Sequence, residues 1–174
     1  EIEENIRKVR DRLAVAPEEV QGWAYLAHQL LNLGKFQEAS EALYQAHKLE
    51  PNRFDYQLMY AESLIMASSE RVTPAAKVIL NRAAKLDPDH PGPKYYLGLA
   101  DFQEGNVEIA YESWKNVRAS LADDDPLRPL VDVWINRAEV NLGLAEPLPQ
   151  SRAPSISREQ AEIIESMSED ERSE

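Results

Sequence analysis

The sequence predicts an all-α fold in which three helix-turn-helix repeats stack into a solenoid. A pattern of small and large residues recurs along the chain, with Ala39, Ala76 and Ala110 at corresponding positions. Gly34 and Gly105 stand at equivalent places in the first and third copies. A recurrence of about 34 residues is typical of helical repeats that bury a core only by stacking on their neighbours.

The recurring pattern is the spacing of the tetratricopeptide (TPR) repeat, in which two antiparallel helices, A and B, form one unit. The first copy reads Trp23-x2-Leu26-Ala27-x2-Leu30, Gly34, Ala39-x3-Leu43-x2-Ala46 and Pro51. The second copy carries Tyr60-Ala61-x2-Leu64, Ala76-x3-Leu80-x2-Ala83 and Pro88. The third copy carries Leu97-Gly98, Gly105 and Ala110-x3-Trp114-x2-Val117. The alternative is an unrelated helical bundle that shows this spacing by accident.

Each recurring position has a physical role in a pair of crossed helices. Only small side chains fit at a close crossing, which accounts for Ala27, Ala61 and Gly98 on the A helices. Large residues such as Trp23 and Trp114 are expected to fill the space between successive helices. Glycine suits the A-to-B turn because a positive φ angle there costs little without a Cβ atom.

The second A-to-B turn is predicted to be longer than the others. Ala39 and Ala76 are 37 residues apart, whereas Ala76 and Ala110 are 34 residues apart. The three additional residues fall around 68–73, between the two helices of the second repeat. We therefore expect an insertion that leaves both packing faces intact.

The helices are expected in a regular order. An apolar stripe at Ile2, Ile6, Val9 and Leu13 indicates an N-terminal helix over residues 2–13 that packs on the first repeat. The A/B pairs are predicted at 20–33 with 36–49, at 54–67 with 74–86, and at 91–104 with 107–121. A further stripe from Leu130 to Leu142, ending at Gly143, predicts a helix that caps the last open face of the solenoid.

The chain is predicted to divide into a TPR domain at 1–145 and a tail at 146–174. The tail opens with a linker rich in Pro, Ser and Ala at 146–154. The capping box Ser157-x-x-Gln160 predicts a short acidic helix near 158–167, either alone or docked on the domain. A disordered acidic tail is the alternative.

Composition excludes several classes of function. The net charge is −12 and the basic residues form no run, which argues against a nucleic-acid partner. There is no cysteine, so disulfides and thiol chemistry are excluded. No apolar run reaches the length of a membrane span. Because the chain begins at Glu1, we expect a fragment or a processed product whose targeting information has been removed.

No catalytic or metal-binding constellation is visible in the sequence. The histidines His28, His47 and His90 belong to different predicted elements, and none has a partner at a metal-ligand spacing. His90 lies in a proline-rich turn, where a role in forming the turn is favoured. The sequence therefore predicts no enzyme, no metal and no cofactor.

The predicted functional site is the concave groove lined by the A helices. Counting from Trp23, the inward positions are mostly apolar and include an acidic patch, which suits the apolar face of a bound helix. Asp55 and Glu62 are expected to pair with Lys or Arg on that ligand. The inward set is Gln21, Ala24, His28 and Leu31 in the first repeat, Asp55, Leu58, Glu62 and Ile65 in the second, and Tyr95, Leu99 and Phe102 in the third.

The chain also shows a family resemblance that covers nearly its whole length. The run from Leu13 to Ala39, the long second turn, the segment Gly98-x3-Phe102-x2-Gly105 and the late Met167-Ser168 resemble the periplasmic TPR domain of the c-type cytochrome biogenesis subunits CcmI or CycH. The resemblance implies a haem-ligation chaperone that holds the C-terminal helix of apocytochrome c and works with haem lyase subunits. It also implies a periplasmic location and an N-terminal membrane anchor that is missing here. The alternative function is a structural TPR adaptor that assembles another complex.

Overall fold

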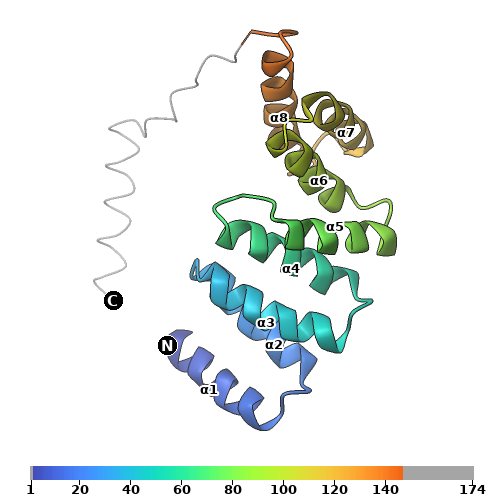
Figure 1. Ribbon diagram of the computed structural model, residues 1–174. Helices are drawn as coiled ribbons and strands as arrows, with labels where there is room; N and C mark the ends of the chain where they lie inside the picture. Colours follow the sequence, from blue (N-terminus) through green and yellow to red (C-terminus); the bar gives the residue numbers. More distant parts are fainter. Residues whose placement is uncertain (1, 147–174) are drawn as a thin grey trace, which may run out of the picture.

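The computed structural model describes residues 2–146 of the 174-residue chain. Within this range the backbone forms eight α-helices and no strand (Figure 1). The helices are α1 (Ile2–Val15), α2 (Val20–Asn32), α3 (Phe36–Leu49), α4 (Phe54–Ala67), α5 (Pro74–Leu86), α6 (Pro91–Gln103), α7 (Val107–Ser120) and α8 (Arg128–Asn141). The predicted linker, beyond Glu146, and the predicted helix near 158–167 lie outside the described residues.

Successive helices pack against one another in chain order and build a solenoid. The pairs α2/α3, α4/α5 and α6/α7 are the three TPR repeats, with α1 before them and α8 after them. The all-α TPR solenoid predicted from the spacing is thereby confirmed. In the described part of the chain, no helix combines the length and the apolar character needed to cross a bilayer.

The positions with small residues lie at the helix crossings, as the spacing predicts. Ala27, Ala61 and Ala110 are each fully buried. A Cβ atom added to Gly98 would lie 2.7 Å from Nε1 of Trp114, so the close approach of α6 to α7 requires glycine. At the A-to-B turns, Gly34 and Gly105 have φ angles of 69° and 86°, in the left-handed region that glycine favours.

The insertion in the second repeat folds as a turn that is held by α6. Ser69 and Glu70 take positive φ angles of 54° and 62° there, where the other repeats have glycine. The side chain of Gln103 fixes this turn, because its Nε2 donates to the backbone oxygen of Glu70 and its Oε1 accepts from the backbone N–H of Val72, both at 2.9 Å. The lengthened turn is therefore tied to the next repeat.

The core is drawn out along the solenoid in three clusters. The first joins α1, α2 and α3, the second joins α4 and α5, and the third joins α6, α7 and α8. Trp114 is fully buried in the third cluster. Trp23 is only partly buried at the first cluster, where its indole N–H donates to the backbone oxygen of Pro17 at 2.8 Å.

Candidate functional site

A cleft of about 620 Å³ opens between α4, α6 and α8, and we refer to it as the main cleft. Three helices form its walls: α4 supplies Leu58, Glu62, Ile65 and Met66; α6 supplies Tyr95, Tyr96 and Leu99; α8 supplies Leu130, Val133, Trp134 and Arg137. Glu70 from the long turn and the segments at 90–92 and 125–127 complete the lining. The lining is largely apolar and aromatic, a composition typical of pockets that take an organic or peptide ligand.

The main cleft brings together part of the groove predicted from the sequence. Leu58, Glu62 and Ile65 of the second repeat line it, as do Tyr95 and Leu99 of the third. Ile65, Tyr95 and Leu99 are at the same time nearly buried, with exposed fractions of 2%, 8% and 5%. They form the floor of the cleft rather than its rim.

The other predicted groove residues lie outside the main cleft. His28 is exposed and its Nδ1 lies 3.4 Å from Nδ2 of Asn32, while Ala24 and Leu31 are partly buried on the same helix, α2. Asp55 is exposed and pairs with Arg53 at 3.8 Å. Phe102 packs in the third core cluster, with its ring centred 5.8 Å from the ring of Trp114 and 5.5 Å from that of Trp134.

Sequence reasoning missed the wall that α8 contributes. The stripe of this helix predicts a cap, and Val131 and Ala138 are fully buried on the third core cluster. Leu130 and Val133 instead remain 53% and 43% exposed and face the main cleft. The available signal was the width of the stripe, because α8 has more apolar positions than one buried face needs.

An aromatic assembly supports the α8 wall. The indole N–H of Trp134 donates to the hydroxyl oxygen of Tyr95 at 3.1 Å, and the indole N–H of Trp114 donates to the backbone oxygen of Tyr95 at the same distance. The rings of Trp114 and Trp134 are stacked with centroids 5.4 Å apart. The guanidinium of Arg137 lies 4.6 Å from the centroid of Trp134. Buried packing and hydrogen bonds together hold this wall in place.

Glu62 is a half-buried charged group within the apolar lining. Burial raises the pKa of its carboxyl group, and a hydrogen bond from the hydroxyl of Tyr96 lowers the pKa in partial compensation. Burial and the neighbouring carboxylate raise the pKa of Tyr96 strongly, so this hydroxyl stays protonated and donates. Among the described residues, no ion pair reaches Glu62.

His90 has the role in the turn that the sequence favours. Its Nδ1 accepts from the backbone N–H of Gly92 at 3.1 Å, which caps the start of α6. Its ring also packs on Phe54, with centroids 4.7 Å apart. In residues 2–146, no group of three or more His, Asp or Glu side chains is placed to hold a metal ion.

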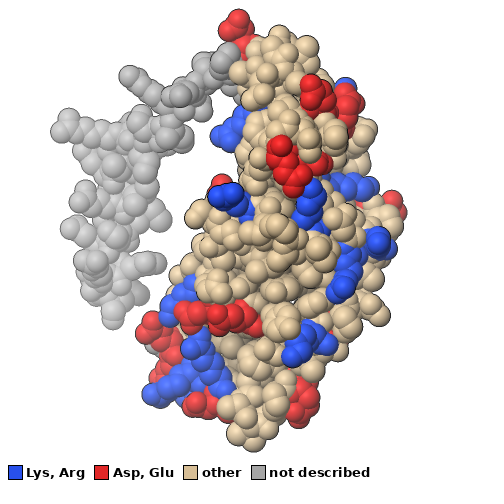
Figure 2. Space-filling model, viewed as in Figure 1, with Lys and Arg blue, Asp and Glu red and all other residues tan. Residues whose placement is uncertain are grey.

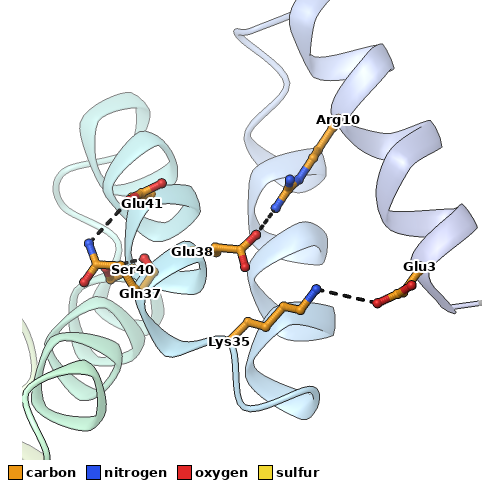
Figure 3. Close-up of polar contacts among 7 residues, drawn as sticks. All are labelled: Glu3, Arg10, Lys35, Gln37, Glu38, Ser40 and Glu41. Atoms are coloured by element: carbon orange, nitrogen blue, oxygen red, sulfur yellow. Dashed lines mark hydrogen bonds and ion pairs between the residues drawn. The ribbon is translucent and has the colours of Figure 1, made fainter.

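A second cleft of about 420 Å³ lies between α1, α2 and α3, and we refer to it as the N-terminal cleft. Its lining includes Trp23 and Leu30, together with Arg10 on α1 and Glu38 on α3. Figure 3 shows that Arg10 forms an ion pair with Glu38. Lys35 reaches Glu3 of α1 at 3.7 Å in the same view. Arg10 and Glu38 are thus matched within the chain, while Glu41, which also lines this cleft, accepts a hydrogen bond from Nε2 of Gln37 at 3.3 Å.

Charged side chains of both signs are present on the face shown in Figure 2. Lys and Arg mix with Asp and Glu at its lower left, while Lys and Arg predominate on the right at mid-height. The ion pairs of the described chain are mostly between exposed groups, for which a contribution of about 0–1 kcal/mol each is usual.

The sequence is similar to one known protein family and to several of its members. A family model described as "Cytochrome c-type biogenesis protein H TPR domain" matches residues 1–128. The cytochrome c-type biogenesis protein CycH of Bradyrhizobium diazoefficiens is 32% identical over 130 residues, which cover 75% of this chain and 35% of the relative. CycH of Rhizobium meliloti is 33% identical over 133 residues, which cover 75% and 34%. The chain therefore spans about a third of the length of these relatives.

The fold was compared with solved structures. MamA from Desulfovibrio magneticus RS-1, residues 41 to the end, superposes with a TM-score of 0.68 at 20% identity and covers 99% of this chain and 87% of its own. The structure of YrrB, described as a TPR protein with an unusual peptide-binding site, gives a TM-score of 0.66 at 14% identity, with 84% and 72% covered. At these identities the likeness shows the TPR fold alone.

Proposed function

The chain belongs to the family of the cytochrome c-type biogenesis protein H TPR domain, and we propose that it is a non-catalytic module that binds an amphipathic helix of a protein partner in the main cleft. One observation carries the proposal: two A helices and α8 form an apolar cleft whose rim exposes Leu130 and Val133. A helix presents apolar anchors at i, i+3, i+4 and i+7, which suits such a groove.

The family directs the proposal to one kind of partner. Its name and those of the relatives refer to cytochrome c-type biogenesis. We infer that the bound helix is the C-terminal helix of an apocytochrome c, held for haem ligation, and that haem lyase subunits are further partners. A periplasmic site of action, with a membrane anchor outside this sequence, belongs to the same proposal.

An adaptor function is the second candidate. Val78 on α5 and Ile109 on α7 are apolar side chains with exposed fractions of 61% and 60%, and both belong to B helices. Exposed apolar residues on this side would suit contact with a folded partner rather than with a helix in the main cleft.

Calorimetric titration of a peptide matching the C-terminal helix of a c-type cytochrome separates the two candidates. Leu130→Glu with Val133→Glu should weaken binding at least about tenfold, because two carboxylates would lose solvation under the ligand. The matched control is Val78→Glu with Ile109→Glu, which makes the same charge change outside the cleft and should leave the affinity within about twofold. Circular dichroism checks that both variants fold.

The two outcomes point in opposite directions. Wild-type affinity in the cleft variant would exclude the main cleft as the binding site. A loss confined to the control variant would mean that the peptide binds to the B helices and not in the main cleft. Leu99 is unsuited to the test although the sequence places it in the groove, because at 5% exposure a glutamate there would also disrupt the core.

A further inference from the structure

We propose that the main cleft selects a helix that carries a lysine or arginine beside its apolar anchors, and that Glu62 and Tyr96 form the subsite for that cation. The inference rests on the proposed function and names the chemistry of its ligand. The occupant is thus a basic amphipathic helix of a partner protein.

Glu62 lies on the face of α4 that lines the main cleft. Leu58 lies one turn before it and Ile65 almost one turn after it, so all three side chains share one face and line the cleft. A ligand helix that places apolar side chains on Leu58 and Ile65 would bring an adjacent long side chain to the carboxylate. Lys and Arg can do so with their aliphatic stems against the apolar wall.

The carboxylate of Glu62 has unused capacity to accept hydrogen bonds. A carboxylate has about four acceptor sites, and Glu62 forms no ion pair with the described residues, the hydroxyl of Tyr96 being the polar neighbour that lowers its pKa. Buried or half-buried carboxylates are ordinarily paired, because an ionised group in apolar surroundings loses solvation. A cation from the ligand would supply the missing partner in the same apolar environment, where a charged hydrogen bond is strong.

The balance of charge around the main cleft argues against an acidic ligand. Glu62, Glu70 and Asp125 line the cleft against one guanidinium, that of Arg137, which lies over the ring of Trp134. A basic segment is therefore attracted and an acidic one repelled. The chain's own tail falls in the repelled class, since residues 147–174 contain more than twice as many acidic as basic residues.

Proton release on binding provides an independent measurement of the contact between Glu62 and the cation of the ligand. A cation next to Glu62 favours its ionised form, so ligand binding should expel the proton that burial favours in the free protein. The other titratable groups that face the cleft also contribute to any pH profile, so each measurement needs a Glu62→Gln counterpart. They are Glu70, His90, Tyr95, Tyr96, Asp125 and Arg137.

A double-mutant cycle between protein and peptide tests the subsite. Each Lys or Arg of the cytochrome helix peptide is replaced in turn by norleucine, which keeps the stem and removes the charge, and each peptide is titrated into wild type and Glu62→Gln. One replacement should weaken binding to wild type about tenfold and have little effect on Glu62→Gln. Proton release on binding, measured near pH 5 in buffers of different ionisation enthalpy, should fall in Glu62→Gln.

Two results would overturn the inference in distinguishable ways. If every norleucine peptide binds wild type as tightly as the parent does, or loses the same affinity on both proteins, there is no cation subsite at Glu62, while the helix-binding function stands. If the parent peptide itself does not bind wild type, the proposed function fails and the subsite fails with it. Tyr96→Phe adds a second variant, which should reduce the coupling without removing it.

Discussion

The two clefts of the solenoid differ in how their charged groups are matched. In the N-terminal cleft, the carboxylate of Glu38 has the guanidinium of Arg10 from a neighbouring helix as its partner. In the main cleft, Glu62 has one hydroxyl and no cation within the described chain. Glu38 is thus neutralised within the chain, whereas Glu62 leaves a charge for a partner to neutralise. This difference makes Glu62, rather than Glu38, the candidate for contact with a cation of a partner.

Among the substitutions that compare the two clefts, removal of Trp114 is expected to destabilise the fold most. Trp114→Ala should lower the free energy of unfolding by about 3–5 kcal/mol, because a fully buried indole leaves a cavity under the α8 wall. Trp23→Ala, at the N-terminal cleft, should cost about 2 kcal/mol, since that side chain is only partly buried. Urea denaturation measures both values. Equal losses would show that the main cleft has no more rigid support than the N-terminal one.

Adding one methyl group beside each cleft sharpens the same contrast. Gly98→Ala should destabilise the fold by about 1–3 kcal/mol, because its Cβ atom would meet the rigid indole of Trp114 at 2.7 Å. Gly22→Ala brings its Cβ atom to within 2.8 Å of a terminal methyl of Leu13, which can rotate away. The gain in helix propensity, about 1 kcal/mol, should then leave Gly22→Ala close to neutral. Melting temperatures that fall together would contradict this ranking.

Neutralising one carboxylate in each cleft should change stability in opposite directions at pH 7. Glu62→Gln should stabilise the free protein by on the order of 1 kcal/mol, because an ionised group without a cation is removed from apolar surroundings. Glu38→Gln should destabilise it by about 0.5 kcal/mol through loss of an exposed ion pair. The measurement is chemical denaturation of the two variants beside wild type.

The pH dependence of the Glu62 effect follows from the sign of its pKa shift. Burial raises the pKa in the folded state above its value in the unfolded chain, so the folded state binds the proton more tightly. The gain from Glu62→Gln should therefore vanish below the unfolded pKa, about 4.3, and appear as the pH rises through the folded value. A gain that is constant from pH 4 to pH 8 would mean that packing, not ionisation, separates the two side chains.

The TPR spacing was sufficient to predict the fold and was insufficient to predict the full lining of the main cleft. Positions such as Ala61, Gly98 and Gly105 are fixed by sterics within one repeat, and that information is local in the sequence. The main cleft instead depends on how α8 stands across from α4, which is a relation between helices more than sixty residues apart. The spacing therefore marked Leu58 and Glu62 and missed Leu130.

The same reasoning explains why some inward positions predicted from the spacing lie outside the main cleft. Inward-facing positions repeat in every A helix, but a cleft forms only where an opposite wall exists. Phe102 is drawn into the third core by Trp114 and Trp134, which belong to α7 and α8. Asp55 meets Arg53 near the start of its own helix, a contact set by local geometry rather than by the repeat.

Deleting residues 147–174 is expected to have the smallest effect on stability and on peptide affinity. This deletion tests the main cleft and not the N-terminal cleft. The proline-rich start of this segment predicts separation from the solenoid, so the melting temperature should change by less than about 2 °C. Peptide affinity should stay constant or rise slightly at low salt, because an acidic segment competes poorly for an acidic cleft. Thermal unfolding and calorimetric titration of the shortened chain give both numbers. A large fall in stability, or a tenfold gain in affinity, would instead show that the apolar residues Ile163, Ile164 and Met167 occupy the main cleft in place of the ligand.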